Sequence, residues 1–496
     1  MAMQRRVKTI EQAIAETDDP GHQLKHDLRT IDLISFGIGV IIGTGIFVLT
    51  GQQAAVNAGP AVTLSFLFAG ITCAFAALCY AELASSVPVA GSAYTYSYAT
   101  LGEVIAWIIG WDLLLELMLG AAVVARGWSA YLQTLLDLPS WMAGAEARPD
   151  WAAVAVVVAL TCLLLRGAKD AGRFTGALVA VKVTVILIVI GVGMRYIDTA
   201  NYRPFIPPAE KLPPDTADVL RQPIVQAFLG LEPTVYGVYG ILAAASVVFF
   251  SYIGFDIVAT TAEETKNPQK DMPRGILGSL LICTILYMAV AATITGMVPY
   301  QDLNDADPLA QAFESLGVTW AAKLVALGAV VGITTVILVL MLGQSRVLFA
   351  MARDRLVPER LARVNTHGAP STITMLIGLG VVLLAAFVPL SELSELVSIG
   401  TLFAFTVVCI AVPVLRRTRP DLPRPFRTPW VPVVPILGVA TCVWLMLNLP
   451  VETWLRFVVW MIIGLVIYGT YGRRHSRLAP GVPPSEAPGA RRTPAG

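Results

Sequence analysis

The feature that most limits how this chain can fold is its set of long apolar runs. Segments 31–50, 151–165, 176–193 and 401–415 carry at most one charged residue over most of their length. A helix needs about 20 mostly apolar residues to cross the hydrocarbon core of a bilayer. Only 14% of the 496 residues are charged, against roughly 25% in soluble proteins. The runs therefore predict an all-α integral membrane protein rather than several soluble domains.

We expect about twelve spans, since each apolar run is long enough to cross once. They lie near 31–52, 59–81, 103–134, 150–166, 172–197, 236–262, 274–298, 320–350, 371–390, 393–415, 430–449 and 453–472. This divides the chain into an N-terminal segment (1–30), a core of the first ten spans (31–415), two further helices (416–472) and a disordered tail (473–496). The first thirty residues lack the apolar centre of a cleavable signal peptide.

Lys and Arg are distributed unevenly between the loops, which predicts the orientation. One set of loops holds Arg166, Lys169, Arg173, Lys266, Lys270, Arg274, Arg353, Arg355, Arg360, Arg363, Arg416, Arg417, Arg419, Arg424 and Arg427. The opposite short loops, 53–58, 299–319 and 391–392, contain no Lys or Arg. With an even number of spans, both termini lie on the basic side. We expect a multi-pass protein of the cell inner membrane with both termini in the cytoplasm.

Two spans contain glycine in mid-membrane, where it weakens a helix by about 1 kcal/mol relative to alanine. The first carries Gly43, Thr44 and Gly45, and the sixth carries Gly254 beside Ser251 and Asp256. Broken backbone survives at this depth only where it is buried in protein or lines a wet cavity. One alternative for the first span is close packing of helices through small residues. Matching breaks five spans apart, running in opposite directions, favour the inverted repeat of secondary transporters.

The helix ends at such breaks predict a binding site for a zwitterion. A helix restarting at Thr44 and Gly45 offers free N–H groups and the positive end of its dipole, which suit a carboxylate. The ends of the preceding segments offer carbonyls that suit an ammonium group. We expect these from Ile41 and from Phe250, Ser251 and Ile253. Such a site matches the backbone of an α-amino acid, and glycine (Gly43, Gly45, Gly254) lets backbone approach the ligand.

Several ordered stretches resemble the amino acid–polyamine–organocation superfamily, in particular its cationic amino acid transporter family and their bacterial relatives. They are GIGVIIGTGIFVLTG (37–51), YAELASSVPVAGSAYT (80–95), FFSYIGFDIVATTAEETKNPQKDMPR (249–274), GQSRVLFAMARD (343–354) and RPFRTPWVPVVPILG (424–438). The resemblance spans about residues 25–470 and implies a five-plus-five inverted-repeat (LeuT-like) bundle with two extra helices. It implies that Ile41, Thr44, Gly45, Phe250, Ser251 and Ile253 hold the amino acid backbone. Arg355 stands where relatives usually have glycine.

Lys182 lies in an apolar run, about 10 residues or ~15 Å of helix from the basic side. A charge there costs at least ~2.5 kcal/mol, and burial favours the neutral amine. A lysine that binds and releases a proton could couple transport to protons, as the resemblance also implies; the alternative is a snorkelling lysine. No other cofactor and no metal are expected.

Acidic and branched residues predict a side-chain pocket. Glu116 shares a helix face with Asp112 and, as the resemblance suggests, could face the site, where it would meet a cationic substrate or Lys182. Asp256 could do the same, or only cap a helix. By the resemblance Ile333, with Thr334 beside it, borders the pocket, and a β-branched residue there favours smaller substrates. Cationic and small neutral amino acids therefore both remain open.

Other classes of function fit less well. The sequence has no Walker-type phosphate loop, no HExxH and no GxSxG, so we do not expect an enzyme. It has no repeated filter or ring of charges typical of a channel, and no nucleic-acid partner is expected. Proton symport of L-amino acids is the favoured function. An exchanger, a non-transporting amino acid sensor, a small accessory membrane subunit and any oligomeric state remain open.

Overall fold

The structure is a computed structural model that describes residues 28–87, 92–144, 147–166, 168–211, 220–230, 234–305, 307–363 and 370–479. Most of the expected N-terminal segment and the tail beyond residue 479 lie outside this part, as does the loop 364–369.

The described chain is almost entirely helical. In chain order it contains α2 (Thr30–Ile41), η1 (Gly45–Leu49), α3 (Thr50–Gln53), η2 (Ala54–Ala58), η3 (Gly59–Ala61), α4 (Val62–Ser86), α5 (Ser92–Thr100), α6 (Glu103–Leu136), α7 (Trp151–Leu165), α8 (Ala168–Gly193), η4 (Met194–Tyr196), η5 (Thr199–Tyr202) and α9 (Ile224–Leu229). It continues with α10 (Gly237–Val248), η6 (Phe249–Tyr252), α11 (Phe255–Val258), η7 (Ala259–Glu264), α12 (Pro268–Met297), η8 (Tyr300–Leu303), α13 (Pro308–Ser315), α14 (Thr319–Arg353), η9 (Glu359–Ala362), α15 (Ser371–Phe387), α16 (Leu390–Thr418), α17 (Val433–Leu447), α18 (Val451–Ile467), η10 (Tyr468–Gly472) and α19 (Arg473–His475). Two short antiparallel strands, β1 (Glu210–Lys211) and β2 (Thr234–Val235), pair in the long connection before α10.

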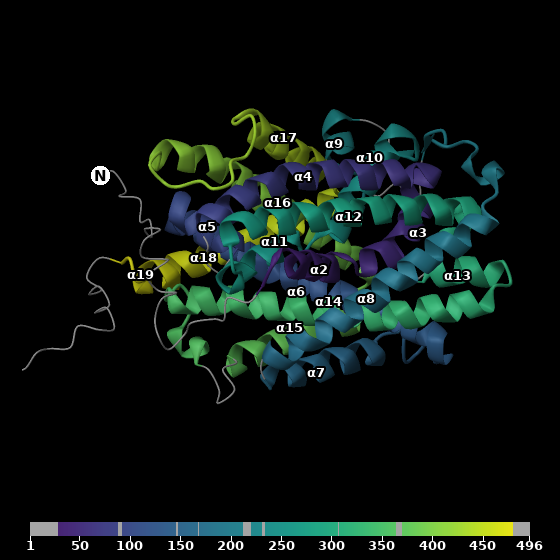
Figure 1. Cartoon of the computed structure of the whole chain (residues 1–496), viewed down its shortest axis with the longest axis horizontal. Helices are drawn as coiled ribbons and strands as arrows, with labels where there is room; N and C mark the ends of the chain where they lie inside the picture. Colours follow the sequence, from purple (N-terminus) through teal and green to yellow (C-terminus); the bar gives the residue numbers. More distant parts are fainter. Residues whose placement is uncertain are drawn as a thin grey trace, which may run out of the picture.

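The long helices run roughly along one axis and form a single bundle (Figure 1). At its centre α6 packs along α14, while α12 packs against α4 and α2. Figure 1 places α3 and α13 at one end of the bundle and α5 and α19 at the other. Segments far apart in sequence therefore meet in the interior, and the two interrupted helices, α2 and α10, lie among them.

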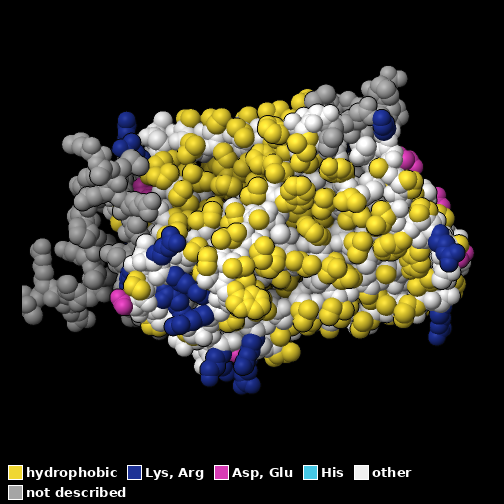
Figure 2. All heavy atoms as spheres, turned by 90° about the horizontal axis from the view of Figure 1, so that it is seen from above, with side chains coloured by type: hydrophobic (Ala, Val, Ile, Leu, Met, Phe, Trp, Pro, Cys, Tyr) yellow, Lys and Arg dark blue, Asp and Glu magenta, His cyan; other side chains and the backbone are white. Residues whose placement is uncertain are grey.

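The outside of the bundle is a broad apolar belt. Figure 2 shows hydrophobic side chains covering the middle of one face, with many Lys and Arg side chains at the end that carries α19. The side chains of Val466 on α18 and Leu379 on α15 are both 58% exposed. An apolar surface as large as this belt is stable in contact with lipid but not with water. Eight helices in the described residues are long and apolar enough to cross a membrane, and four more apolar helices are shorter. This confirms a helical membrane protein, while the count of twelve spans and the inverted repeat stay predictions.

Polar residues at one helix start explain where that helix begins. Asp150 precedes α7, and its carboxylate accepts a 3.0 Å hydrogen bond from the amide of Ala153, which caps the helix. The same carboxylate accepts the hydroxyl of Ser129 at 2.6 Å and lies 3.7 Å from the guanidinium of Arg126. These buried contacts join α7 to α6.

Two features at the basic end bear on the sequence expectations. The described part of the expected tail is hydrogen-bonded, because the hydroxyl of Ser476 donates to Glu103 Oε2 at 2.5 Å. Tyr468 donates to Glu103 Oε1 at 2.9 Å.

Arg355 has a φ of +62°, a conformation that favours glycine, which accounts for the glycine expected there in relatives.

Candidate functional site

The first interruption lies between α2 and η1. The helix α2 ends at Ile41, Ile42 is extended, and Thr44 returns to helical geometry before the π-helical segment η1 begins at Gly45. The sequence predicted an unwinding point over residues 43–45, and the structure places it one residue earlier. A helix end leaves carbonyl groups without their usual amide partners. The carbonyls of Gly39, Ile41 and Ile42 are accordingly free to accept hydrogen bonds from side chains of other helices.

The second interruption follows α10. The chain tightens into η6, Ile253 is extended with ψ 133°, and α11 begins after Gly254. Gly254 has a φ of +122°, and a Cβ there would overlap the side chain of Val40 on α2. Glycine is therefore required at this position by both backbone geometry and the close approach of α2. Asp256 Oδ1 accepts the amide of Gly254 at 3.1 Å, so this carboxylate does cap the turn.

The two interruptions touch each other. A Cβ on Gly45 would overlap the side chain and Cα of Ser251, so only glycine permits this approach. The Ser251 hydroxyl is buried and has no hydrogen-bond partner among the described residues. An unsatisfied buried hydroxyl costs free energy, and here it lies at the meeting point of the two broken segments. It is thus a polar group available to a ligand.

Tyr287 on α12 bridges the two interruptions. Its hydroxyl lies 2.7 Å from the carbonyl oxygen of Ile41 and 2.7 Å from that of Ser251. A phenol has a single proton to donate, so the two carbonyls share it. Sequence reasoning missed this residue, because a tyrosine inside an apolar span carries no pattern that marks it. The carbonyl of Phe250, expected to be free, accepts the amide of Ile253 at 3.1 Å.

Thr44 faces α6. Its hydroxyl lies 3.5 Å from the carbonyl oxygen of Val124, and a Cβ on Gly127 would overlap its side chain. Beside it, a Cβ on Gly43 would come within 3.2 Å of Val336 on α14. The restarted segment is therefore enclosed by α6 and α14, with residues 43–45 supplying its first amide groups.

Lys182 contacts the first interruption at the end of α2. It is fully buried, and its ammonium group donates to the carbonyl oxygens of Gly39 at 2.6 Å and Ile42 at 3.0 Å. Its third bond goes to the hydroxyl of Thr335 on α14 at 2.9 Å. A lysine that snorkelled to the membrane surface would instead expose its ammonium group. The lysine thus ties α8 to α2 and α14 with neutral oxygen acceptors.

Three carboxylates, those of Asp112, Glu116 and Asp256, lie near enough to one another to interact electrostatically. Asp112 and Glu116 are buried on α6, and none of their four oxygens has a hydrogen-bond partner among the described residues. Glu116 interacts electrostatically with Asp256 and lies beside Thr401, whose hydroxyl donates to the carbonyl of Val397 instead. Glu116 does not meet Lys182, whose partners are the oxygens named above. Buried acids without a cation are costly, which marks this place for a ligand or a proton.

The remaining predicted pocket residues lie on α14. Ile333 is fully buried. Thr334 accepts a 2.9 Å hydrogen bond from the indole of Trp128 on α6 and donates to the carbonyl of Val330. The next residue, Thr335, is the partner of Lys182. The sequence analysis gave Thr335 no role, since its contact with Lys182 crosses 153 positions of the chain.

The sequence of this chain is similar to a family of known proteins. Residues 28–468 match the family described as "Amino acid permease". "Branched-chain amino acid permease BcaP" of Bacillus subtilis (strain 168) is 45% identical, over 95% of this chain and 98% of that protein. "Methylthioribose transporter" of the same organism is 42% identical, over 95% and 98%. "Cationic amino acid transporter 4, vacuolar" of Arabidopsis thaliana is 38% identical, over 84% and 67%.

Proposed function

The chain belongs to the amino acid permease family, and we propose that it carries L-amino acids across the cell inner membrane in symport with protons by alternating access. Its relatives are named permeases and transporters rather than enzymes. In this proposal the chain has about twelve spans with a five-plus-five inverted repeat. Both termini are cytoplasmic, in keeping with the positive-inside rule.

The environment of Lys182 carries the proposal of proton coupling. Its ammonium group is buried and bonded to Gly39, Ile42 and Thr335 without a carboxylate partner. Because these acceptors are neutral, release of the proton leaves no unpaired negative charge behind. Deprotonation leaves an amine with two N–H donors, so at least one of the three bonds is lost and the others lose their charge assistance, which would loosen α8 and α14 from the break in α2. Proton release and movement around the site are thereby linked.

The meeting of the two interruptions supports an α-amino acid as substrate. Residues 43–45 provide amide groups for a carboxylate at the start of a helical segment. The carbonyls of Ile41 and Ser251, which both accept the hydroxyl of Tyr287, suit an ammonium group. The Ser251 hydroxyl adds a polar group that has no partner among the described residues. Tyr287 holds these carbonyls in position, and the second lone pair of each carbonyl remains available to the ammonium group of the substrate.

We propose a branched aliphatic amino acid as the preferred substrate. The name of the Bacillus subtilis permease supports this choice, and the apolar side chain of Ile333 at the expected pocket suits an aliphatic substrate that fits the space left by its branching. A cationic amino acid is the second candidate, because Glu116 and Asp256 lie near enough to interact electrostatically and neither is paired with a cation in the described part of the chain. Relatives named for cationic substrates support that candidate.

Uptake by the purified protein in liposomes tests the proposal. Radiolabelled leucine, alanine, lysine and glutamate are offered with and without an inward-acid proton gradient, with unlabelled methylthioribose as a competitor and protein-free liposomes as the control. Accumulation of leucine that requires the gradient supports symport. Uptake only into vesicles preloaded with amino acid would make the protein an exchanger. Specific binding without any uptake would make it a sensor, and stronger competition by methylthioribose than by any unlabelled amino acid would make methylthioribose the preferred substrate.

A further inference from the structure

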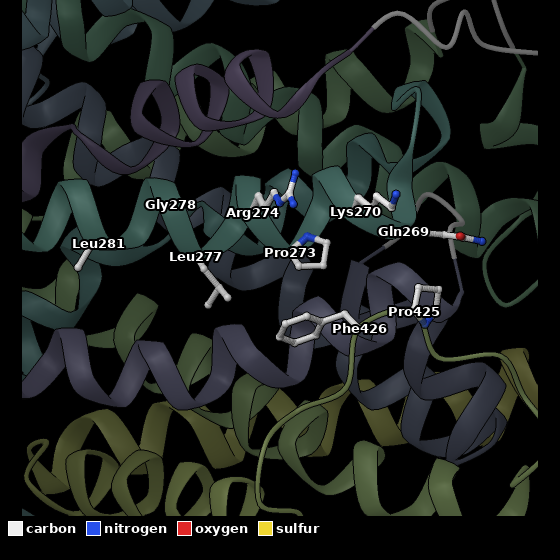
Figure 3. A pocket seen from close by; sticks show the side chains of 9 residues that line it. All are labelled: Gln269, Lys270, Pro273, Arg274, Leu277, Gly278, Leu281, Pro425 and Phe426. Carbon is white, nitrogen blue, oxygen red and sulfur yellow. The ribbon is translucent and has the colours of Figure 1, made fainter.

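A pocket outside the substrate site opens between the start of α12 and the connection from α16 to α17. Its volume is about 480 Å³, and Lys270, Arg274, Leu277, Leu281 and Phe426 are among the residues that line it. Figure 3 shows Leu277 and Pro273 of α12 on the side of Phe426, whereas the long side chains of Lys270 and Arg274 extend away from Phe426 in this view. The pocket therefore has one wall from a long helix and one from a loop more than a hundred residues later.

The helix wall changes from basic to apolar along one face. Lys270 and Arg274 are four residues apart, and Leu277, Leu281 and Ile285 continue the same face. Leu281 is 62% exposed and Ile285 is 59% exposed. From residue 277 to residue 285 the helix rises about 12 Å, close to the depth of one hydrocarbon leaflet, which is about 15 Å. The face thus matches the profile of a single lipid molecule, with its headgroup at Lys270 and Arg274.

Within the described residues, no acidic side chain is paired with the positive charge of this pocket. Neither Lys270 nor Arg274 forms an ion pair with any residue in the described ranges. Asp271, the acid between them, accepts the hydroxyl of Thr30 at 2.5 Å. The carboxylate of Glu82 already accepts hydrogen bonds from Arg416 and from the amide of Thr428, so it does not pair with Lys270 or Arg274. Two like charges one turn apart repel each other and would be stabilised by an anion.

We propose that this pocket binds an anionic glycerophospholipid, with its phosphate on Lys270 and Arg274 and an acyl chain along Leu277, Leu281 and Ile285. Guanidinium and ammonium groups are the common partners of phosphate, and basic pockets between membrane helices on the cytoplasmic side suit anionic headgroups. The ring of Phe426 covers the apolar part from the loop side. Free phosphate would use only the two cations and would gain nothing from the apolar half of the pocket.

Such a lipid would connect two parts of the transporter. The headgroup would contact α12, the helix that also carries Tyr287. The acyl chain would contact Phe426 in the loop that leads into α17. The lipid would therefore be a ligand of the protein with a defined position, rather than part of an averaged boundary layer.

Native mass spectrometry of the delipidated full chain in detergent tests this inference. The protein is titrated with phosphatidylglycerol, phosphatidylcholine of the same acyl chains, and inorganic phosphate. We expect the first phosphatidylglycerol to bind at least tenfold more tightly than phosphatidylcholine. The double variant K270Q/R274Q should bind it about thirtyfold more weakly than the wild type, since each basic side chain at an anionic lipid contributes about a factor of five. The charge-retaining K270R/R274K should keep most of the affinity.

The matched control is R166Q/R360Q, which removes two exposed positive charges outside the pocket from loops on the same predicted side of the membrane. It should leave the preference for phosphatidylglycerol unchanged, and all variants should elute as monodisperse protein. Equal binding of the two lipids would overturn the inference, as would an unchanged preference in K270Q/R274Q or an equal loss in R166Q/R360Q. Inorganic phosphate that binds as tightly as phosphatidylglycerol, and depends on the same two residues, would replace the lipid by a free anion.

Discussion

The ammonium group of Lys182 lies 2.6 Å from the carbonyl oxygen of Gly39, within the last turn of α2 before its interruption. An uninterrupted helix would supply a backbone amide to this carbonyl. The interruption removes that amide, and a side chain from α8 takes its place. The same exchange occurs at Ile41, whose carbonyl accepts the hydroxyl of Tyr287 from α12. The broken helix is thus completed by the helices around it, and each completing side chain can be tested.

Replacement of Lys182 should separate transport from the proton gradient. In Lys182→Ala the carbonyls of Gly39 and Ile42 lose their donor, and the amine that would carry the proton is removed. We expect gradient-driven leucine uptake to fall by at least about tenfold, as for an intramembrane ionisable group with a functional role. Uptake into liposomes at several external pH values measures this. Lys323→Ala, at an exposed lysine of α14, is the control. An unchanged pH profile in Lys182→Ala would refute coupling through this residue.

Removal of one hydroxyl should weaken substrate binding through the position of the two carbonyls. In Tyr287→Phe the aromatic ring can still pack against Tyr252, whose ring centroid lies 5.2 Å from that of Tyr287. The carbonyls of Ile41 and Ser251, however, lose the hydroxyl that donates to both. A net hydrogen bond contributes about 0.5–1.5 kcal/mol, so we expect affinity to change by about three- to tenfold. Isothermal titration with leucine gives the value. Tyr202→Phe removes a comparable bond to the carbonyl of Ala292 away from the site and should bind normally. Equal affinity in the two variants would argue against the bridge.

A single methyl group at Gly45 should block the approach of the two interruptions. Its Cβ would overlap Ser251, and overpacking costs about 1–3 kcal/mol. We expect Gly45→Ala to lose leucine binding by roughly tenfold or more. Gly191→Ala is a matched control on α8, where an added Cβ meets nothing within 4 Å. That variant should bind normally and gain up to about 1 kcal/mol in helix stability. Normal binding by Gly45→Ala would mean that the two segments separate when substrate enters.

Neutralising Glu116 should reveal which side chains the pocket accepts. A charge-assisted contact contributes about 1.5–3 kcal/mol. If Glu116 meets the substrate side chain, Glu116→Gln should weaken competition by lysine and arginine by about tenfold and leave competition by leucine nearly unchanged. Competition against radiolabelled leucine in liposomes gives both values. Asp112→Asn neutralises the buried acid one turn earlier and should affect lysine and leucine alike. A parallel loss for both substrates in Glu116→Gln would place this carboxylate outside the side-chain pocket.

The buried ion pairs of Glu82 should contribute strongly to stability. Its carboxylate is 1% exposed and accepts from Arg416 at 2.7 and 2.9 Å and from the amide of Thr428 at 2.7 Å. Removing one partner of a buried pair costs about 3–5 kcal/mol, so Glu82→Ala should clearly lower the melting temperature in detergent. The control removes the exposed pair of Arg355 and Glu359. Glu359→Ala should change stability by about 1 kcal/mol or less. Similar melting temperatures for both variants would contradict the prediction.

Several parts of this architecture could be predicted from local sequence. The apolar runs predicted the helices, because the membrane leaves a helix as one of few ways to satisfy backbone groups. The expected spans 103–134 and 320–350 correspond closely to α6 and α14. The glycines around residue 44 and at residue 254 predicted both interruptions, since glycine is costly within a helix. Lys182 was recognisable because a charge deep in an apolar run is rare.

Other parts depended on contacts that no local pattern carries. The hydroxyl of Tyr287 reaches Ile41 across 246 positions of the chain, and Lys182 reaches Gly39 across 143. Helix formation is decided by neighbouring residues, so the sequence by itself determined the helices, the places where they break and the uneven charge of the loops. Which side chain completes each broken end depends on which helices pack around it. The tertiary structure alone decided the roles of Tyr287 and Thr335, the separation of Glu116 from Lys182, and the pocket at Lys270 and Arg274.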